Sequence, residues 1–426
     1  MDHSADGVVL LIGSGQQLYR QYLMEGASQR RPLWLIDSQD ATWQRRFVVG
    51  SSVVKMLDSA RAEPDEQALL DAALEVSGSR GVVGVFTYDE QYVMATARIA
   101  ERLDLRGFSV DGADSCRNKH RTRLALTAAD LPQPRFVLAQ NVADAGCAAE
   151  DFGYPVVLKP RGMGASIGVV RATDAGELLA AFAVAEHAGF SGPHAYETGV
   201  LVEELVAGPE ISVDGAVVTG EYRPFFVARK ELGLEPYFEE VGHVVQGDDP
   251  LLHDPDLRQV LAEAHRVLGV RDGITHTEVR LSDRGPVVIE VNARLGGDLI
   301  PYLGKLATGI DPGRVAVEVA TGSRPGLEPT RRTCVGIRFR YPPEDCKVVD
   351  VSVPAAATFA GLLEARAMVP PGATVRLPPR AHIDRYAYVI CTADHPAACA
   401  ARLEEAAALI TLEHERVEPA LVDNRA

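Results

Sequence analysis

Short apolar runs alternate with helical patterns along the first quarter of the chain. The apolar runs are GVVLLIG, RPLWLID, FVVGSSVV and GVVGVFT, and the helical segments between and after them include SGQQLYRQYLMEGASQ, DEQALLDAALEVS and DEQYVMATARIAERLDL. Strands that alternate with helices form βαβ units, whose strands lie parallel in one sheet. The pattern therefore predicts an α/β domain with a doubly wound parallel sheet over residues 1–112.

Charge and cysteine usage exclude several classes of protein. The 426 residues include 59 acidic and 43 basic side chains, so the formal net charge is −16. Such a chain lacks the overall positive field that concentrates nucleic acid or anionic lipid. The six cysteines are scattered without a CxxC pair. This spacing argues against a zinc ribbon or a disulfide framework and favours reduced thiols in a cytosol.

The sequence carries no signal for a membrane or for export. No apolar run approaches the roughly 18–20 residues of a membrane helix. The N-terminus MDHSADGVVLLIG has acids where a secretory leader has a basic region. We therefore expect a cytoplasmic protein that binds small molecules, with neither a nucleic acid nor a membrane as its partner. A homodimer is the default assembly for a protein of this kind.

The patterns change after residue 112. NKHRTRLALTAADLPQP predicts a helix that LPQP stops, and a later helix begins after Asp174, a suitable N-cap. The following segments predict an antiparallel β region: LVEELV, EISVDGAVV, THTEVRL and VVIEVNAR. The tail after about residue 331 mixes strands with a final helix, PAACAARLEEAAALI. The whole chain is expected to be α/β (α+β).

The segment THTEVRLSDRGPVVIEVNARLGG is the most informative part of the sequence. Side chains alternate between the two faces of a strand. Val287, Ile289, Val291 and Ala293 should therefore share a core face, whereas Glu290, Asn292 and Arg294 share the opposite, polar face. Taken alone, such a face is more often simply exposed to solvent. A second acidic strand just before it, carrying Glu278, favours a functional site.

Two hairpin registers fit these strands. If Asp283-Arg284-Gly285 is a three-residue loop with Gly285 left-handed, Glu278 lies opposite Glu290. Like charges at that distance destabilise a sheet. A hard divalent cation removes the conflict, because Mg²⁺ takes carboxylate oxygens together with substrate phosphates. Asn292 could add a neutral oxygen ligand.

A glycine-rich loop follows the strand that ends at Lys159. In PVVLKPRGMGASIGVV the glycines are Gly162, Gly164 and Gly168, and a second strand follows them. Small residues let backbone N–H groups approach an anion, and a lysine supplies a point charge. Because no helix follows, a mobile hairpin lid over phosphates fits better than a Walker loop. The alternative is a flexible hairpin that binds nothing.

Three weaker patterns remain. The GSGQQL segment has Leu18 at the third glycine position, so we interpret it as a structural turn and not as a dinucleotide fingerprint. LVEELVAGPEISVDG carries Glu203, Glu204 and Glu210. Backbone groups in this segment could bind an adenine edge, and a carboxylate could accept from ribose hydroxyl groups. Taken alone, the segment suggests a solvated acidic turn. His243 lies among apolar neighbours, which favours a satisfied core histidine unless it faces a cleft.

Together these motifs resemble the ATP-grasp superfamily of carboxylate–amine ligases. A lysine before a helix (Lys119 in NKHRTR), Lys159 before its glycine-rich hairpin, the EELV hinge and the E…ExNxR pair occur in the family's order over residues 113–300. The segments THTE…IEVNARLGGD and FEEVGHVVQ look most like L-amino-acid ligases. The resemblance implies an ATP-grasp fold with four parts: an N-terminal domain (1–112), a small lid region (113–201), a catalytic core (202–330) and an α+β completion of the substrate domain (331–426).

The resemblance also implies ATP and Mg²⁺ as cofactors, with Mn²⁺ as a substitute, and a role for each motif. Lys119 and Lys159 would hold phosphates, under a lid that contains Gly162, Gly164, Ser166 and Gly168. Glu203, Glu204, Leu205 and Val206 would form the adenine hinge, Glu210 would bind the ribose, and Lys230 would lie on the phosphate side. Glu278, Glu290 and Asn292 would hold two Mg²⁺ ions. Arg294, Lys159 and His243 would be the catalytic residues, with Arg294 neutralising substrate charge and His243 touching substrate.

The implied reaction joins a small-molecule carboxylate to an amine through an acyl phosphate, with release of ADP and phosphate. Two amino acids are the expected substrates. Three alternatives stay open: a carboxylase of the biotin-dependent type, a D-alanine–D-alanine-like ligase, and a regulatory protein that binds ATP without turnover.

Overall fold

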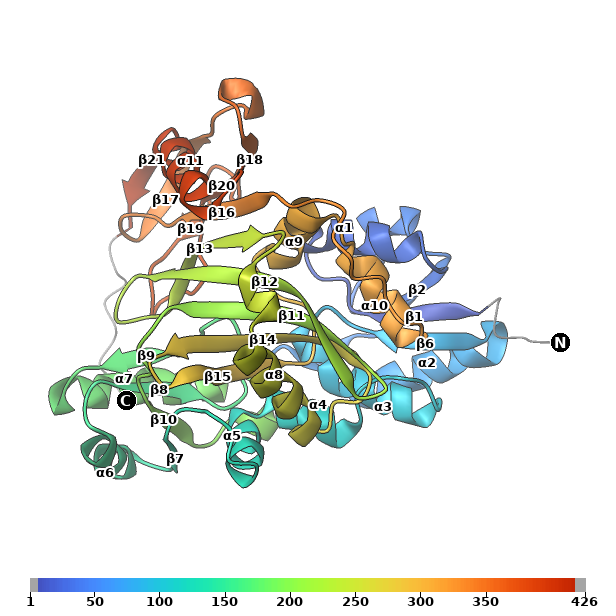
Figure 1. The fold of residues 1–426 in the computed structure, drawn as a ribbon, viewed down its shortest axis with the longest axis horizontal. Coiled ribbons are helices and arrows are strands. Elements are labelled where there is room, and N and C mark those ends of the chain that lie inside the picture. The colour runs from blue at the N-terminus through green and yellow to red at the C-terminus, as the bar shows by residue number, and fades with distance from the viewer. Residues whose placement is uncertain (1–6, 418–426) are drawn as a thin grey trace.

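The computed structural model describes residues 7–417, and the expectation about a leader falls on residues 1–6, outside this range (Figure 1). The predicted parallel sheet is present, in the order β3-β2-β1-β6. Its strands are β1 (Val8–Ile12), β2 (Leu33–Asp37), β3 (Gly50–Val53) and β6 (Val82–Phe86), with helices α1 (Gln17–Ser28), α2 (Glu66–Arg80) and α3 (Val93–Arg102). A small hairpin, β4 (Met56–Asp58) and β5 (Glu63–Pro64), and the 3₁₀ turns η2 (Trp43–Arg46) and η3 (Glu90–Tyr92) complete this part.

Strand β1 is buried on both faces, as a central parallel strand must be. Val9 and Leu11 point to one face, which is covered by α1 and by α10 (Pro312–Ala320). Leu10 and Ile12 point to the other face, which is covered by α2 and α3. One helix that covers the N-terminal sheet is therefore supplied by a segment about 200 residues farther along the chain.

A second sheet, β7-β10-β8-β9, forms the lid region. Its strands are β7 (Phe136–Ala139), β8 (Val156–Pro160), β9 (Val170–Ala172) and β10 (Val200–Glu204), and α4 (Val110–Arg117), α5 (Lys119–Ala128), α6 (Val142–Phe152), α7 (Ala175–Ser191) and η4 (His194–Tyr196) accompany them. The Asp174 side chain caps α7, as expected, by accepting from the backbone N–H groups of Gly176 and Glu177. The boundary expected between residues 201 and 202 falls inside β10.

The central element is an eight-stranded antiparallel sheet in the order β15-β14-β11-β12-β13-β16-β20-β18. Its strands are β11 (Glu210–Val218), β12 (Glu221–Gly233), β13 (Glu239–Gln246), β14 (Gly273–Ser282), β15 (Gly285–Asn292), β16 (Cys334–Arg340), β18 (Leu362–Ala367) and β20 (Ala387–Ala393). Helices α8 (Pro255–Val267), α9 (Ile300–Thr308) and α11 (Pro396–Ala408) pack on it. The tail adds a small sheet of β17 (Cys346–Ser352), β19 (Thr374–Val375) and β21 (Thr411–Arg416), and η5 (Pro250–His253) and η6 (Ala356–Thr358) are further 3₁₀ turns.

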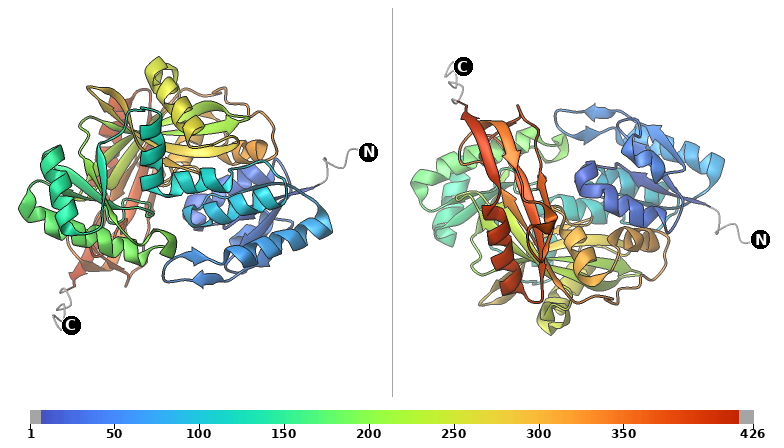
Figure 2. Two further views of the ribbon diagram at one scale, coloured as in Figure 1. Left: turned by 90° about the horizontal axis from the view of Figure 1, so that it is seen from below. Right: turned by 90° about the horizontal axis from the view of Figure 1, so that it is seen from above.

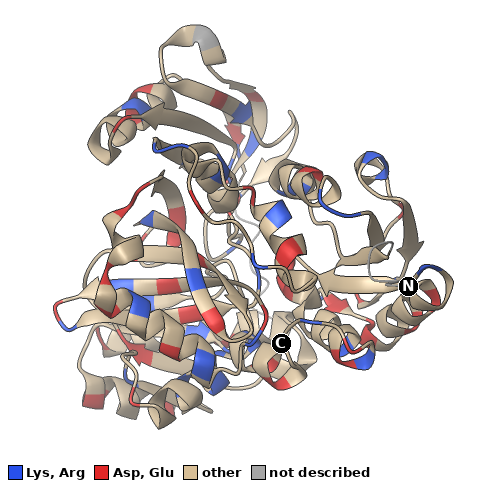
Figure 3. Cartoon of the chain, turned by 45° about the vertical axis from the view of Figure 1, so that its right-hand side comes forward, with Lys and Arg blue, Asp and Glu red and all other residues tan. Residues whose placement is uncertain are grey.

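The parallel sheet and the lid sheet lie at opposite ends of the molecule, with the central sheet between them (Figures 1 and 2). Acidic and basic residues are interspersed along the central sheet and the helices beside it (Figure 3). Within residues 7–417, no helix is long and apolar enough to cross a membrane.

Arg123 of α5 joins the lid sheet to the central sheet. Its guanidinium is buried and donates from Nε to Glu203 Oε1 of β10 at 2.6 Å. It also donates to the carbonyl oxygens of Val288 at 3.3 Å and Ile289 at 2.7 Å, both on β15. One side chain therefore satisfies buried or partly buried acceptors on both sheets.

Arg123→Met should destabilise the fold strongly, because it leaves two carbonyl groups without this donor and leaves the buried Glu203 with Lys159 as its remaining ion-pair partner. We expect the free energy of unfolding in urea to fall by about 3–5 kcal/mol. Arg135→Met is the matched control, since Arg135 pairs with the neighbouring Glu204 of β10 at 3.0 Å but is half exposed. That variant should lose at most about 1 kcal/mol. Equal losses in the two variants would contradict this account.

Gly313 of α10 lies against the backbone of α1. A Cβ atom placed on Gly313 would lie 2.0 Å from the carbonyl oxygen of Leu23. Gly313→Ala should therefore force the two helices apart and lower the free energy of unfolding by about 1–3 kcal/mol. Gly78→Ala in α2 is the control, because a Cβ there meets nothing within 4 Å. It should leave stability unchanged or raise it by up to about 1 kcal/mol. Thermal unfolding of both variants tests the contact.

Candidate active site

Glu278 and Glu290 lie directly opposite each other on β14 and β15. This register does not arise from the three-residue loop that the sequence suggests. Ser282 pairs with Gly285 across a two-residue turn, and a bulge next to Glu278 then shifts the register by one residue. Gly285 has φ +94°, so its left-handed conformation is as predicted. The expected pairing of the two carboxylates is thus confirmed, while the loop length was wrong.

The bulge also changes which side chains face the core. Val288, Val291 and Ala293 pack in the core beneath the sheet. Ile289, which strict alternation assigns to that core, instead lines a cavity together with Glu290 and Asn292. Two successive residues of a bulged strand oppose one residue of its partner, so alternation fails at that point. The prediction for Ile289 was wrong for this reason.

A cavity of about 800 Å³ lies between the lid sheet and the central sheet. Most of the residues proposed from the sequence line it: Lys119, Lys159, Gly164, Ser166, Glu203, Glu204, Leu205, Val206, Glu210, Glu278, Glu290, Asn292 and Arg294. Four do not: Gly162, Gly168, Lys230 and His243. The motifs are thus brought together from two sheets, from helix α5 and from loops that include the one between β8 and β9.

Gly162 and Gly168 shape the lid loop from behind. A Cβ on Gly162 would lie 2.5 Å from Tyr196, and one on Gly168 would lie 2.4 Å from Ala188 of α7. Gly168 also has φ +74°, which disfavours any side chain. These two glycines therefore let the loop pack closely on its own domain, while Gly164 and Ser166 face the cavity.

Each lysine of the cavity is paired with a carboxylate. Lys119 Nζ lies 2.9 Å from Glu290 Oε1, and Lys159 Nζ lies 2.6 Å from Glu203 Oε2. Burial lowers the pKa of Lys159, and Glu203 only partly offsets this. Burial alone would raise the pKa of Glu203, but Arg123 and Lys159 hold it below its ordinary value. The Arg123–Glu203–Lys159 network is therefore charged and tightly paired.

Lys230 contacts three carboxylates from behind the cavity wall. Its Nζ lies 2.8 Å from Glu210, 2.6 Å from Glu240 and 3.0 Å from Glu278. Burial opposes the charged form, but these acids raise the pKa of Lys230 well above its ordinary value. Glu210 is held further by Arg280. Lys230 thus positions the acids that line the cavity and does not itself reach into it.

The acids beside Lys230 suit a divalent cation. Burial raises the pKa of Glu278, Lys230 lowers it, and the neighbouring carboxylates Glu210, Glu290 and Glu240 raise it again. Burial together with the carboxylates thus outweighs the one lysine, and the pKa of Glu278 lies above its ordinary value. Glu278, Glu290 and Asn292 offer hard oxygen ligands of the kind Mg²⁺ takes. The donor set therefore fits the magnesium ions expected from the sequence.

A second cavity of about 490 Å³ adjoins the first. The two share Ala165, Ser166, Glu240, Glu278 and Arg294. The second cavity is also lined by Asp298, which follows β15, and by Arg385, from the loop before β20. A molecule in the second cavity would thus lie directly beside whatever the first cavity holds.

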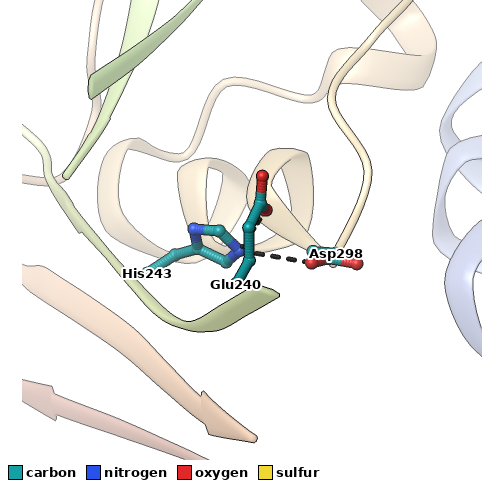
Figure 4. A group of neighbouring side chains, drawn as sticks. All are labelled: Glu240, His243 and Asp298. Carbon is teal, nitrogen blue, oxygen red and sulfur yellow. Dashed lines mark hydrogen bonds and ion pairs between the residues drawn. The ribbon is translucent and has the colours of Figure 1, made fainter. Parts of the chain in front are cut away.

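His243 lies behind the wall of this second cavity. Its Nε2 lies 3.1 Å from Glu240 and 3.5 Å from Asp298, whereas its Nδ1 is buried without a hydrogen-bond partner (Figure 4). Burial lowers the pKa of His243, but the two carboxylates raise it above its ordinary value. The side chain is buried, as predicted, but it is not the fully satisfied core histidine that the sequence favours, because Nε2 contacts two carboxylates and Nδ1 has no partner.

Arg294 lies where the two cavities meet. Its Nε lies 2.5 Å from Glu90 of η3, and its Nη1 donates to the carbonyl oxygen of Leu295 at 2.8 Å. Arg294 and Arg117 outweigh burial and lower the pKa of Glu90 to about 2. Arg294 is therefore a fixed cation whose position depends on the N-terminal domain.

Sequence analysis missed five residues of this site: Glu90, Arg123, Glu240, Asp298 and Arg385. Glu240 and Asp298 belong to segments already singled out, FEEVGHVVQ and LGGD, so both could have been proposed. Glu90, Arg123 and Arg385 have no local signal, because distant segments bring their partners to them.

Comparison with known proteins agrees with this geometry. An ATP-grasp domain model matches residues 152–302, and an L-amino acid ligase C-terminal domain 2 model matches residues 338–415. Protein y4rH of Sinorhizobium fredii is 29% identical over 76% of this chain and 67% of its own length. The alanine–anticapsin ligase of Bacillus subtilis is 27% identical over 60% of this chain, which spans 57% of that relative.

The crystal structure of an L-amino acid ligase from Bacillus licheniformis has a similar fold. Its TM-score is 0.79 at 21% identity, and the match covers 96% of this chain and 99% of that one. The likeness therefore extends through the N-terminal domain, the lid, the central sheet and the C-terminal segment. The chain thus contains an ATP-grasp domain and a segment that matches the C-terminal domain of L-amino acid ligases, and its fold is similar to that of an L-amino acid ligase.

Proposed function

We propose that this protein is an ATP-dependent ligase that joins the carboxylate of one amino acid to the amine of another and releases ADP and phosphate. One observation carries the proposal: a cavity with lysines and paired acids adjoins a second charged cavity, and Glu278 and Arg294 line both. A nucleotide in the first cavity would meet a carboxylate in the second at these two residues.

The residues of the larger cavity suit a nucleotide. Leu205 and Val206 would present backbone groups to the adenine, and Glu210 would accept from ribose hydroxyl groups. Lys119 and Lys159 would exchange their present carboxylate partners for phosphate oxygens. The loop that carries Gly164 and Ser166 would close over the phosphates. Lys230 would support this region by holding Glu210 and Glu278 in place.

Glu278, Glu290 and Asn292 would hold Mg²⁺, which neutralises the charge of the phosphates when bound. The γ-phosphoryl group would pass to an oxygen of the substrate carboxylate, as its bond to ADP breaks. The amine nitrogen of the second substrate would then attack the carbonyl carbon, forming the amide bond, and phosphate would leave with the acyl–oxygen bond broken.

The protein's own residues would protect and stabilise these steps. Arg294 would neutralise the negative charge that develops on the acyl oxygen atoms, because its guanidinium is already fixed by Glu90. The lid loop would exclude water, which would otherwise hydrolyse the acyl phosphate. His243 would act on substrate through Glu240 and Asp298, the two carboxylates that it contacts.

The matched C-terminal domain supports this function over the alternatives. Residues 338–415 fit the C-terminal domain of L-amino acid ligases. Structures of biotin carboxylases share the fold at 15–16% identity, which says nothing of the reaction. An alanine–anticapsin ligase among the relatives favours amino acids as substrates.

The function is tested by phosphate release from ATP and Mg²⁺ across all pairs of the twenty amino acids, with mass spectrometry of the products. Release by a few pairs, with a matching dipeptide mass, is the expected result. Release with bicarbonate alone would indicate a carboxylase instead. Binding of ATP with no release from any pair would favour a regulatory protein.

Glu290→Gln should abolish most of this activity, because it removes a charged metal ligand and the partner of Lys119. We expect kcat/KM for the best substrate pair to fall by at least about 100-fold. Glu221→Gln is the control. Glu221 is the first residue of β12, and its side chain forms an exposed ion pair with Arg324. Its activity should stay within about twofold of the parent protein. A Glu290→Gln variant that stayed active would contradict the role of Glu290 as a metal ligand in this site.

A further inference from the structure

Arg385 enters the second cavity from the C-terminal segment, and the role inferred for it rests on the proposed function. Its side chain is only 1% exposed. Nε donates to the Tyr341 hydroxyl at 2.8 Å, and Nη2 donates to Asp298 Oδ2 at 2.6 Å and to the Glu240 carbonyl oxygen at 2.8 Å. The guanidinium also lies 3.8 Å from the centroid of the Phe339 ring. Arg385 is therefore held rigidly in one orientation.

One nitrogen of this guanidinium lacks a hydrogen-bond partner among the described residues. Nη1 is buried, and no described atom accepts a hydrogen bond from it. The Tyr19 hydroxyl of α1 also interacts with the guanidinium, but no contact of Nη1 has the geometry of a hydrogen bond. A buried donor without an acceptor costs about 1–3 kcal/mol. Because Arg385 lines the second cavity, a molecule bound there could supply the missing acceptor.

The charges around the cavity decide which kind of acceptor fits. Arg385 is already matched by Asp298, and Arg294 is already matched by Glu90. Figure 4 shows Asp298 and Glu240 converging on His243, so two carboxylates border this space. Because both guanidinium groups already have carboxylate partners, an anionic side chain would gain no unmatched positive charge from either and would be buried beside two further carboxylate groups. An uncharged oxygen would accept from Nη1 without that cost.

The position of the cavity decides which substrate brings this oxygen. The cavity shares Glu278 and the lid residues Ala165 and Ser166 with the nucleotide cavity. The carboxylate substrate is the one that must lie beside the phosphates. We propose that Arg385 is a specificity-determining residue and that the carboxylate substrate is an amino acid with a neutral, oxygen-bearing side chain, a hydroxyl or a carboxamide, that accepts a hydrogen bond from Nη1.

The first test needs no mutation. Threonine and valine have almost the same shape, as do asparagine and leucine, but only one member of each pair offers a side-chain oxygen. In the parent protein, with glycine as the amine, threonine and asparagine should exceed valine and leucine in kcat/KM by about 100-fold. Fragment masses of the products should place the polar residue at the N-terminus of the dipeptide. Equal rates within each pair would overturn the proposal.

Variants then test the role of Arg385. Arg385→Met should reduce the preference for the polar member of each pair to less than about tenfold, and Arg385→Lys, which lacks the planar fork, should give an intermediate value. Arg380→Met is the matched control, because Arg380 belongs to the same loop region but pairs with Asp345 away from the cavity. The Arg380→Met variant should keep the parent protein's preference for the polar member of each pair. An unchanged preference in Arg385→Met would overturn the proposal.

A binding measurement separates this inference from the proposed function. Calorimetric titration of threonine and valine into the parent protein, with Mg²⁺ and a non-hydrolysable ATP analogue, reports on the cavity without turnover. Tighter binding of threonine by about 100-fold, even with no phosphate release from any pair, would support the cavity assignment while the ligase function failed. Equal binding of threonine and valine, together with dipeptide formation, would overturn the cavity assignment while the ligase function held.

Discussion

The one-residue bulge at Ile289 is the local constraint on which the site depends. It places Glu290 opposite Glu278 and turns Ile289 into the cavity, while Val288 fills the core position that alternation would give to Ile289. A regular hairpin with the same two-residue turn would set Glu278 opposite Ile289 and would face Glu290 away. The placement of the proposed metal ligands and of Ile289 in the cavity proposed for the nucleotide is therefore a consequence of a single backbone irregularity.

The charges of the site are arranged in pairs that a nucleotide would rearrange. Lys119, Lys159 and Lys230 each contact at least one carboxylate in the present structure. Only Lys119 and Lys159 line the cavity, so only these two can turn to phosphates, and Lys230 stays with its acids. Arg123 keeps Glu203 occupied when Lys159 leaves it, which prevents a buried carboxylate from losing every partner. The network thus separates residues that bind from residues that hold others in position.

The sequence predicted those parts of the fold and site that short-range patterns specify. Alternation of apolar runs and helices located the parallel sheet, and the spacing of Lys159, Gly164, Glu290 and Asn292 located the cavity. Two kinds of feature could not be predicted from the sequence. A bulge has no local signature, so Ile289 was assigned to the wrong face. Long-range pairs cannot be read from either member, as with Arg123 and Glu203, 80 residues apart, or Arg385 and Asp298, 87 residues apart.

The position of α10 has a consequence for synthesis of the chain. The face of the parallel sheet that carries Val9 and Leu11 is covered partly by α10, which ends at Ala320. A ribosome that adds about 5–20 residues per second needs roughly 10–40 seconds to proceed from the end of the N-terminal domain to the end of this helix. During that interval α1 can already pack on this face, but the part of the apolar face that α10 covers has no helix over it. The N-terminal domain is therefore the first part of the chain to be made but cannot be the first part to be finished.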